Sequence, residues 1–223
     1  MQSLMHFRVV MPEGCELSVE GETVDMSLAS SYSLSETNKL RAYGFPVRGY
    51  KLADIDWIYD ASQIEVYGNG RSLPFVTLED GSFLAVDYYQ GDAVPGIRAR
   101  AAELAGKYAL FMSNDYSFWA LDPYIVYGSP LREVLYGMDM TWFGYHEYTE
   151  VNNLRMSDPV VVGDGYAMVN ASFDYDVIRW DGTDRSPIEL CLIMRLEEDG
   201  YWRLADLENN IQIDLPMSDQ SPW

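Results

Sequence analysis

The sequence predicts an α+β fold, in which a small all-β domain, a sandwich or a barrel, precedes a cone-shaped domain of helices packed on a curved antiparallel sheet. Three observations support this prediction. Short alternating runs with glycine turns fill the first part of the chain, a helical period follows over residues 97–112, and alternation returns after residue 144. Helices followed by a meander of long strands are typical of an α+β domain.

Short strands joined by tight turns account for residues 1–94. Alternating runs within residues 6–89 are separated by breaks that contain glycine, such as Gly68–Gly70 and Asp80–Gly81. This even spacing is typical of a small sandwich or barrel. Between the strands, the polar and serine-rich segment 27–45 predicts a long loop with one helical turn or none.

The character of the sequence changes near residues 92–95. This change predicts a boundary between a small β domain of residues 1–94 and a cone domain of residues 95–223. Pro95 suits the first turn of a helix, because the N–H that proline lacks would have no partner there. Apolar residues then recur at helical spacing on one face. They are Ile97, Ala101, Leu104, Ala105, Tyr108, Phe111 and Met112.

Two shorter helical segments and a set of long strands complete the chain. Residues 117–128 predict a short helix or turn that Pro123 interrupts. Ser129 before Pro130 is a helix cap followed by proline at the first helical position, so we expect a helix over residues 131–143. After residue 144 the period is two, with glycine-containing turns between three long strands. We expect this sheet to curve over the helices.

A family resemblance supports the cone. The order of one long helix, two short ones and an alternating meander includes the segments GSPLREVL, GYAMVNASFDY and EEDGYWRLADL. In this order, residues 97–208 resemble the nuclear transport factor 2-like superfamily of α+β cones, which includes ketosteroid isomerases, polyketide cyclases and non-enzymatic domains. The resemblance implies a cavity between the sheet and the helices, where enzymes of the superfamily place a carboxylate or histidine that moves protons.

The N-terminal half carries a second resemblance. Its segment VVMPEGCELSVEGETV is similar to the opening hairpin of small extracytoplasmic β domains in membrane-anchored bacterial proteins. This resemblance implies that the chain is the outer part of such a protein, with its anchor removed. It also implies an extracytoplasmic location, tethered or secreted.

Net charge limits the classes of partner. The 223 residues include 15 basic and 35 acidic side chains, a net charge of −20 that is spread along the chain. Such a surface is repelled by phosphate backbones and anionic lipid headgroups, so we expect no nucleic-acid partner. No apolar run is long enough to cross a bilayer, and residues 1–10 lack the layout of a signal peptide. We therefore expect membrane contact only through an anchor outside this chain.

Few residues are suited to metal or redox chemistry. Cys15 and Cys191 are the only thiols, and His6 and His146 are the only imidazoles. They do not form a zinc-ligand spacing, so we expect no metal and no cofactor. One disulfide is possible if the two thiols meet in space. Two buried, reduced cysteines acting as small apolar side chains are the interpretation we favour.

His146 and Asp174 are the candidates for a proton-transferring group, and we assign neither a catalytic role. Residues i and i+2 of a strand share a face, so Asp174 and Asp176 point the same way. Their face also carries Tyr166, Met168, Asn170 and Ser172. The opposite face is more apolar and is expected to pack inward, with Ala167, Val169, Ala171, Phe173, Tyr175 and Val177. We therefore expect both aspartates to be solvated, and His146 to be a hydrogen-bonded loop residue.

Aromatic residues crowd into residues 119–148, around the expected mouth of the cavity. Most are expected in the core, but the polar tips of tyrosine and tryptophan also suit a half-wet binding surface. The ligand-binding candidates are Trp119, Tyr124, Trp142, Tyr145, His146 and Tyr148.

These features favour a non-catalytic binding or interaction module, with an unknown small molecule or protein bound at the cone cavity or its aromatic rim. Two alternatives stay open. One is a small-molecule enzyme of the isomerase or cyclase type, with His146 or Asp174 as base and a tyrosine hydroxyl as oxyanion donor. The other is a dimerisation scaffold that forms a homodimer through the open face of the cone sheet.

Overall fold

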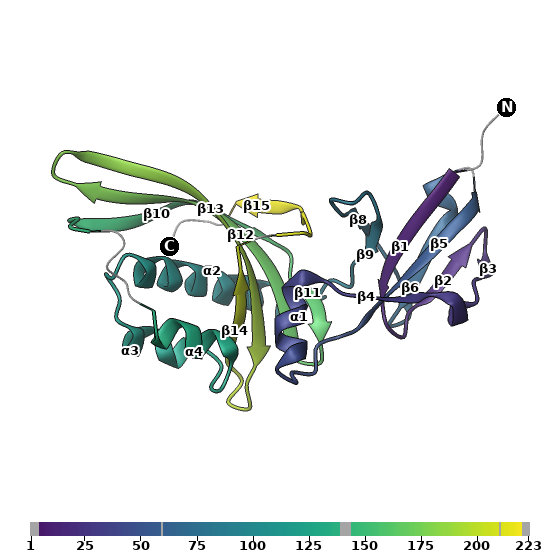
Figure 1. Cartoon of the computed structure of the whole chain (residues 1–223), viewed down its shortest axis with the longest axis horizontal. Helices are drawn as coiled ribbons and strands as arrows, with labels where there is room; N and C mark the ends of the chain where they lie inside the picture. The colour runs from purple at the N-terminus through teal and green to yellow at the C-terminus, as the bar shows by residue number, and fades with distance from the viewer. Residues whose placement is uncertain (1–4, 59, 139–143, 210, 220–223) are drawn as a thin grey trace.

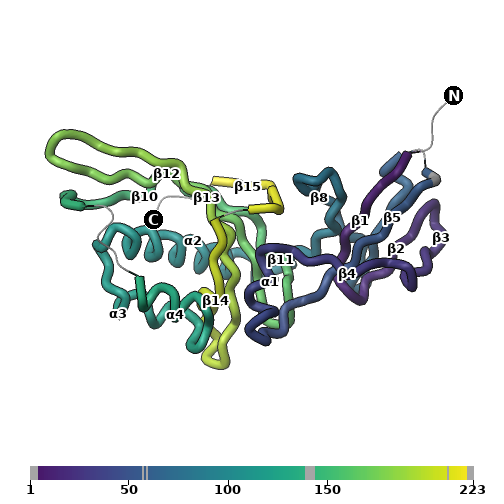
Figure 2. Tube along the Cα trace, in the orientation of Figure 1, coloured from purple at the N-terminus to yellow at the C-terminus, as the bar shows by residue number. Residues whose placement is uncertain are grey.

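A computed structural model describes residues 5–58, 60–138, 144–209 and 211–219. The fold is α+β, as predicted, with helices packed against a large antiparallel sheet. Figure 1 shows this sheet and its helices at one end of the molecule and a unit built of shorter strands at the other. In Figure 2, the hairpin of the two longest strands runs out past the end of the longest helix.

The N-terminal unit consists of two small sheets with a shared core. One sheet has the order β4 (Ser30–Tyr32), β5 (Tyr50–Ile58), β1 (Met5–Pro12), β9 (Phe83–Ala85) and β8 (Phe75–Thr77). The other has the order β3 (Glu22–Thr23), β2 (Glu16–Val19), β6 (Ile64–Gly68) and β7 (Arg71–Leu73). Alternate residues of both sheets, such as Val9 and Val66, are fully buried in one cluster. This arrangement is sandwich-like, because each sheet turns one apolar face toward the other.

The prediction of a long loop over residues 27–45 was wrong. This segment contains the short turn η1 (Met26–Leu28), the strand β4 and the two-turn helix α1 (Ser35–Ala42). Leu34 and Leu40 are buried against the large sheet. The segment is polar and has no helical stripe, so tertiary packing rather than local pattern stabilises this helix.

The helices of the second half follow the predicted pattern. They are α2 (Ala93–Met112), α3 (Phe118–Leu121), the 3₁₀ turn η3 (Asp122–Tyr124) and α4 (Pro130–Tyr136). The predicted stripe of α2 faces the sheet: all of its residues are buried except Met112, which is partly buried against the same core. Ser129 caps α4 by accepting a hydrogen bond from the backbone N–H of Arg132 at 3.2 Å. Residues 139–143 of the predicted third helix lie outside the described part of the chain.

The large sheet is a meander around two long strands. Its order is β14 (Trp202–Glu208), β13 (Gly182–Leu196), β12 (Tyr166–Arg179), β10 (Tyr148–Ser157) and β15 (Met217–Asp219), with β11 (Val160–Gly163) also paired to β12. All of these pairings are antiparallel. The predicted inward face of β12 is confirmed, because Val169, Phe173 and Val177 are buried in the core beneath α2. This face therefore determines where the helices pack.

The other face of β12 is not solvated over its first half, contrary to our expectation. Tyr166, Met168 and Asn170 are 2%, 1% and 0% exposed. Side chains from both sides of residue 94, including Leu40 and Ile213, cover them. The strand pattern could not indicate this cover, because it comes from segments distant in sequence.

Asp87 connects the three sheets at the junction where the N-terminal unit meets the large sheet. It follows β9, and its carboxylate accepts hydrogen bonds from Arg48 at 2.6 Å and Arg71 at 2.5 Å. Asn69 adds a third at 2.8 Å, and the backbone carbonyl of Asp87 accepts from Val161 N in β11 at 2.7 Å. Burial alone would raise the pKa of Asp87, but the two arginines outweigh it and the pKa is lowered. The ionised carboxylate therefore stabilises the junction.

We predict that Asp87→Asn lowers the free energy of unfolding by about 3–5 kcal/mol, because it leaves two guanidinium groups facing a neutral amide. Urea denaturation at neutral pH measures the difference, with the exposed Asp181→Asn as the matched control. Since the pKa of Asp87 is lowered in the folded protein, its contribution is lost as the pH falls through that pKa, and the difference narrows in acid. Equal stability of the two variants would contradict this role.

A second charged cluster anchors α1 to the sheet. The buried Glu36 accepts hydrogen bonds from the backbone N–H groups of Gln212 and Ile213 at 2.8 and 3.2 Å. Lys39 Nζ lies 2.7 Å from Asp206 and 3.7 Å from Glu208. Burial, with the charges of Asp206 and Glu36, raises the pKa of Glu208, although Lys39 opposes the rise. The cluster holds more negative charge than Lys39 offsets.

We predict that Glu208→Gln raises the melting temperature at pH 7 by a few degrees. The reason is that a raised pKa means that the folded state disfavours the ionised carboxylate, so its charge destabilises the fold above the folded-state pKa. The gain should disappear in acid, where wild-type Glu208 is protonated. Scanning calorimetry across pH 4–7 checks this, and the exposed Glu198→Gln serves as control. A lower melting temperature at pH 7 would show that the contact with Lys39 dominates.

Candidate functional site

A cavity of about 550 Å³ opens between α2 and the strands β12 and β13. It exists because β14 is shorter than its neighbours: its last residue, Glu208, pairs with Cys191. Among the described strands, the segment Gly182–Leu190 of β13 pairs with β12 alone. The sheet is therefore narrower beside the C-terminal half of α2, and the space is left open.

The cavity wall is mainly apolar and aromatic. Its lining residues are Tyr108, Ala109, Met112, Phe173, Tyr175, Pro187, Ile188, Glu189, Leu190 and Asn209. None of these ten is basic, and Glu189 is the one carboxylate among them. Such a wall suits a molecule with a substantial apolar body.

Two tyrosines bring hydroxyl groups to this wall. Tyr175 donates a hydrogen bond to the backbone carbonyl of Ala109 at 3.2 Å. Burial raises the pKa of Tyr175, although hydrogen bonds with Ser113 and Thr149 oppose the rise, and burial also raises the pKa of Tyr108. Both hydroxyls therefore keep their protons at neutral pH and present polar but uncharged groups.

Beside the cavity, His146 belongs to a hydrogen-bonded cluster at the end of α2. Its side chain is 9% exposed, with Nε2 3.1 Å from Asp115 and Nδ1 3.2 Å from the carbonyl oxygen of Gly144. Both neighbours are acceptors, so both contacts are hydrogen bonds only when each ring nitrogen carries a proton. The other oxygen of Asp115 accepts from Thr149 at 2.7 Å and Ser113 at 3.2 Å. As expected, His146 is a hydrogen-bonded loop residue, and it does not line the cavity.

This cluster ties the start of β10 to α2. Burial would raise the pKa of Asp115, but hydrogen bonds from Thr149, His146 and Ser113 outweigh it and lower the pKa. Ser113 and Thr149 also form hydrogen bonds with the hydroxyl of Tyr175, so the cluster contacts a residue that lines the cavity. The cluster thus holds the start of β10 against the end of α2 next to the cavity.

The two aspartates of β12 have different surroundings. Asp174 is half-buried and accepts a hydrogen bond from Asn153 at 2.6 Å. Asp176 is 3% exposed and is bound by Arg185 at 2.7 and 2.6 Å, so the expectation that it is solvated was wrong. The hydrogen bond from Arg185 lowers the pKa of Asp176 against the effect of burial. Neither aspartate lines the cavity.

The structure places the described aromatic candidates outside the cavity lining. Trp119, Tyr145 and Tyr148 are 68%, 84% and 49% exposed. Tyr124 contacts Arg100 and Lys107, whose charged groups lie 4.7 and 4.4 Å from its ring centroid. Trp142 lies outside the described residues.

Of the lining residues, the sequence predicts Tyr108 and Met112 on the apolar stripe of the helix, and Phe173 and Tyr175 on the inward face of the strand. These two sets of apolar residues border an open space because β14 is shorter than β12 and β13. The length of β14 depends on pairing register, which the alternating pattern leaves open.

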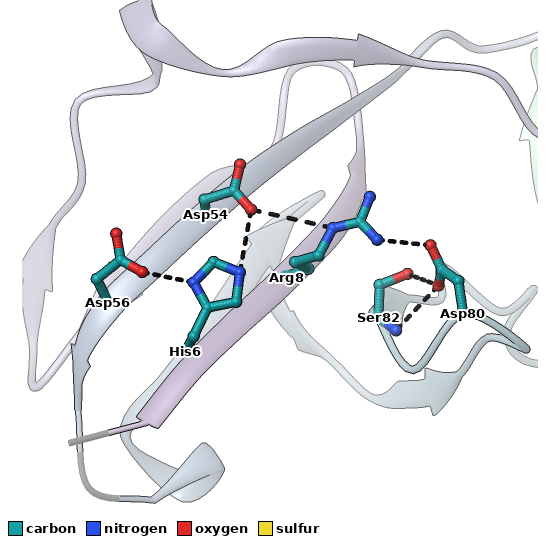
Figure 3. Close-up of polar contacts among 6 residues, drawn as sticks. All are labelled: His6, Arg8, Asp54, Asp56, Asp80 and Ser82. Carbon is teal, nitrogen blue, oxygen red and sulfur yellow. Dashed lines mark hydrogen bonds and ion pairs between the residues drawn. The ribbon is translucent and has the colours of Figure 1, made fainter. Parts of the chain in front are cut away.

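A separate polar cluster crosses the outer face of β1 and β5 (Figure 3). His6 lies between Asp56, at 2.5 Å, and Asp54, at 3.4 Å. Arg8 bonds to Asp80 at 2.8 Å, and Ser82 bonds to the same carboxylate. The ion-paired side chains are partly or largely exposed, whereas Ser82 is buried. Surface ion pairs of this kind contribute roughly 0–1 kcal/mol each. Within the described residues, no group of three or more histidine, cysteine, aspartate or glutamate side chains is arranged to hold a metal ion.

Both cysteines are free thiols, Cys15 half-buried and Cys191 fully buried. Comparison of the chain with protein-family models, with curated proteins and with solved structures finds no match. Over the described residues, no helix combines the length and apolar character needed to cross a membrane.

We predict that Asp115→Asn lowers the free energy of unfolding by about 1–3 kcal/mol, because the hydrogen bonds from the buried Ser113 and Thr149 lose their ionised acceptor. The lowered pKa of Asp115 means that its contribution is present above the unfolded-state pKa and is lost as the pH falls through the folded-state value. Urea denaturation at neutral and acidic pH tests both statements, with the exposed Asp214→Asn as control. A constant difference at all pH values would rule out the ionised carboxylate as the cause.

Proposed function

We propose that the chain is a non-catalytic binding module that holds a small apolar molecule in the cavity between α2 and the strands β12 and β13. The observation that carries this proposal is the size and character of the cavity, about 550 Å³ with aromatic and aliphatic walls. Cavities that bind small molecules commonly have about 300–1,000 Å³ and mainly apolar walls with few polar groups.

The lining chemistry favours binding over catalysis. Proton transfer at neutral pH needs a base with a tuned pKa inside the cavity. Among the described lining residues, Glu189 is the one with a carboxylate, and Glu189 is exposed to solvent. His146 and Asp174, the predicted candidates, contact other protein groups outside the cavity.

The resemblance to nuclear transport factor 2-like cones supports the same position for a ligand, because it implies a cavity between the sheet and the helices. That superfamily includes non-enzymatic domains, which is consistent with a binding role. The resemblance, and the extracytoplasmic location implied for the N-terminal half, stay predictions.

One observation favours the enzyme alternative over a purely structural role for the cluster beside the cavity. Ser113 and Thr149 connect Asp115 to the Tyr175 hydroxyl, so a proton route from His146 reaches the cavity wall. Isomerase or cyclase chemistry would also need a protein base inside the cavity that takes a proton from the substrate, and this route does not supply one.

The alternative of a dimerisation scaffold is limited by the small part of the large sheet that stays open to a second copy. The first half of the outer sheet face is covered by the chain itself. The open edge of β13 carries Pro187, paired with Asp174. The backbone N–H of Asn170 points toward β10, where it donates to the Ser157 hydroxyl, and the backbone of Asp174 has the same orientation four residues later. Their partners in β13 therefore direct their backbone nitrogens away from β12, toward the open edge. Proline has no N–H to offer there, which opposes extension of the sheet by a second copy.

We predict that Met112→Trp, which fills the cavity, weakens binding of the uncharged apolar dye Nile red by about tenfold or more. Val134→Trp is the matched control, because it adds the same side chain at an exposed position of α4 outside the cavity. Fluorescence titration measures both, and circular dichroism verifies that each variant is folded. Absence of saturable dye binding to the wild type would reject the proposal, and equal affinity of both variants would move the site elsewhere.

A further inference from the structure

We infer that an extended peptide segment of a partner protein binds along the open edge of β13 and places alternate apolar side chains in the cavity. The segment continues the sheet beyond Glu208, where β14 ends, and carries a basic residue between two apolar ones. This inference goes beyond the proposed function, because it adds a strand edge to the cavity and a peptide to the small apolar molecule. Three features carry it: the exposed edge, the position of the cavity beside that edge, and the charge on the other face of the strand.

The exposed edge of β13 is the first feature. Residues 182–187 and Glu189 are exposed, and among the described strands this segment pairs with β12 alone. The backbone nitrogens of Cys191 and Pro187 point away from β12, and backbone groups two residues apart point to the same side. The N–H and C=O of Glu189, which lies between them, therefore also point outward. Such an edge is a template for one further strand, and main-chain hydrogen bonds then supply affinity.

The composition of this edge suits a short segment better than a second copy of the chain. Glu189 can both donate to an added strand and accept from it, whereas Pro187 can only accept because proline has no N–H. The ladder is therefore short. A second copy would bring a further net charge of −20 against the same edge, whereas a short basic segment is attracted by this charge.

The position of the cavity is the second feature. Ile188 and Leu190 of β13 line it, and their side chains face the core beneath α2. Residues opposite each other on neighbouring strands share a face, so an added strand would place alternate side chains beside Ile188 and Leu190. The cavity of about 550 Å³ thus lies where the next strand would bury its apolar side chains.

The charge on the other face of β13 is the third feature. Glu189 lies two residues before Cys191, which belongs to the core on that face, so the Glu189 side chain points away from the cavity. Glu208 pairs with Cys191 and lies on the same face. Arg185 is a cation on this face too, but two hydrogen bonds to Asp176 neutralise it. A basic residue opposite Glu189 therefore lies near two carboxylates.

These features define the register of the segment. If it runs in the direction of β14, antiparallel to β13, its first three residues lie opposite Leu190, Glu189 and Ile188. The first and third face the cavity and are apolar, and the second faces the carboxylates and is basic. The N–H of the second residue donates to the backbone carbonyl of Glu189, and the N–H of the third points away from β13.

Fluorescence anisotropy of a labelled peptide tests this inference. The probe is N-acetylated Phe-Lys-Leu-Thr-Ser-Thr with fluorescein at its C terminus. A methyl group on the backbone nitrogen of its lysine removes the N–H that donates to Glu189, so we expect about tenfold weaker binding. The same methyl group on the leucine nitrogen points away from β13 and should leave the affinity unchanged. Equal affinity of the two methylated peptides would overturn strand addition.

Substitutions test the two faces of the added strand. The wild type should prefer the probe over a peptide with glutamate in place of lysine by about threefold or more. Glu189→Lys should reverse this preference, whereas Glu198→Lys, at an exposed position outside the cavity, should keep it. A preference that is the same in both variants would show that general surface charge is the cause, and would overturn the register.

Filling the cavity tests the apolar face. Met112→Trp should weaken binding of the probe about tenfold, and Val134→Trp should not, with circular dichroism to verify that both variants are folded. Equal affinity of the two variants would show that the peptide side chains do not enter the cavity, contrary to the inference.

The outcomes separate this inference from the proposed function. If the wild type binds Nile red but not the peptide, the cavity binds small apolar molecules and the peptide inference is wrong. If the peptide binds with the expected difference between the methylated forms but Nile red does not bind, the inference holds and the proposed function fails. If neither binds, both fail.

Discussion

The long antiparallel pairing of β12 with β13 is the interaction on which the rest of the structure depends. Every residue of β12, from Tyr166 to Arg179, has a partner in β13. Because side chains alternate across a strand, the same pair of strands supplies both cores: Val169 packs under α2 and Met168 packs under the segments around α1. The helices, the N-terminal unit and the C-terminal segment are thus positioned by one ladder of hydrogen bonds.

The same pairing produces the cavity. Because β12 and β13 continue where β14 has ended, they form with β10 a three-stranded part of the sheet, whose apolar face lies toward the end of α2. A wider sheet would bring side chains from a further strand into this space. The cavity is therefore a consequence of unequal strand lengths, and its walls are residues that would be ordinary core in a more complete sheet.

Paired charges stabilise the buried polar groups of this acidic molecule. In a chain of net charge −20, the buried carboxylates Asp87 and Asp176 are paired with arginines, and Asp115 is held by His146 and two hydroxyl groups. Some of the other basic side chains stack on aromatic rings, as Lys107 does on Tyr124 and Arg132 on Tyr127.

Local pattern in the sequence determined the α+β class, the sheet-facing stripe of α2, the capped start of α4 at Ser129 and the inward face of β12. These depend on periods of 3.6 and 2 and on capping groups, which act between residues close in sequence. Only the tertiary structure decided that residues 35–42 form a helix, that Tyr166–Asn170 is covered on both faces, and that Tyr108 and Phe173 border a cavity. Those outcomes depend on the register and length of strands and on contacts between segments distant in sequence, for which a local pattern carries no signal.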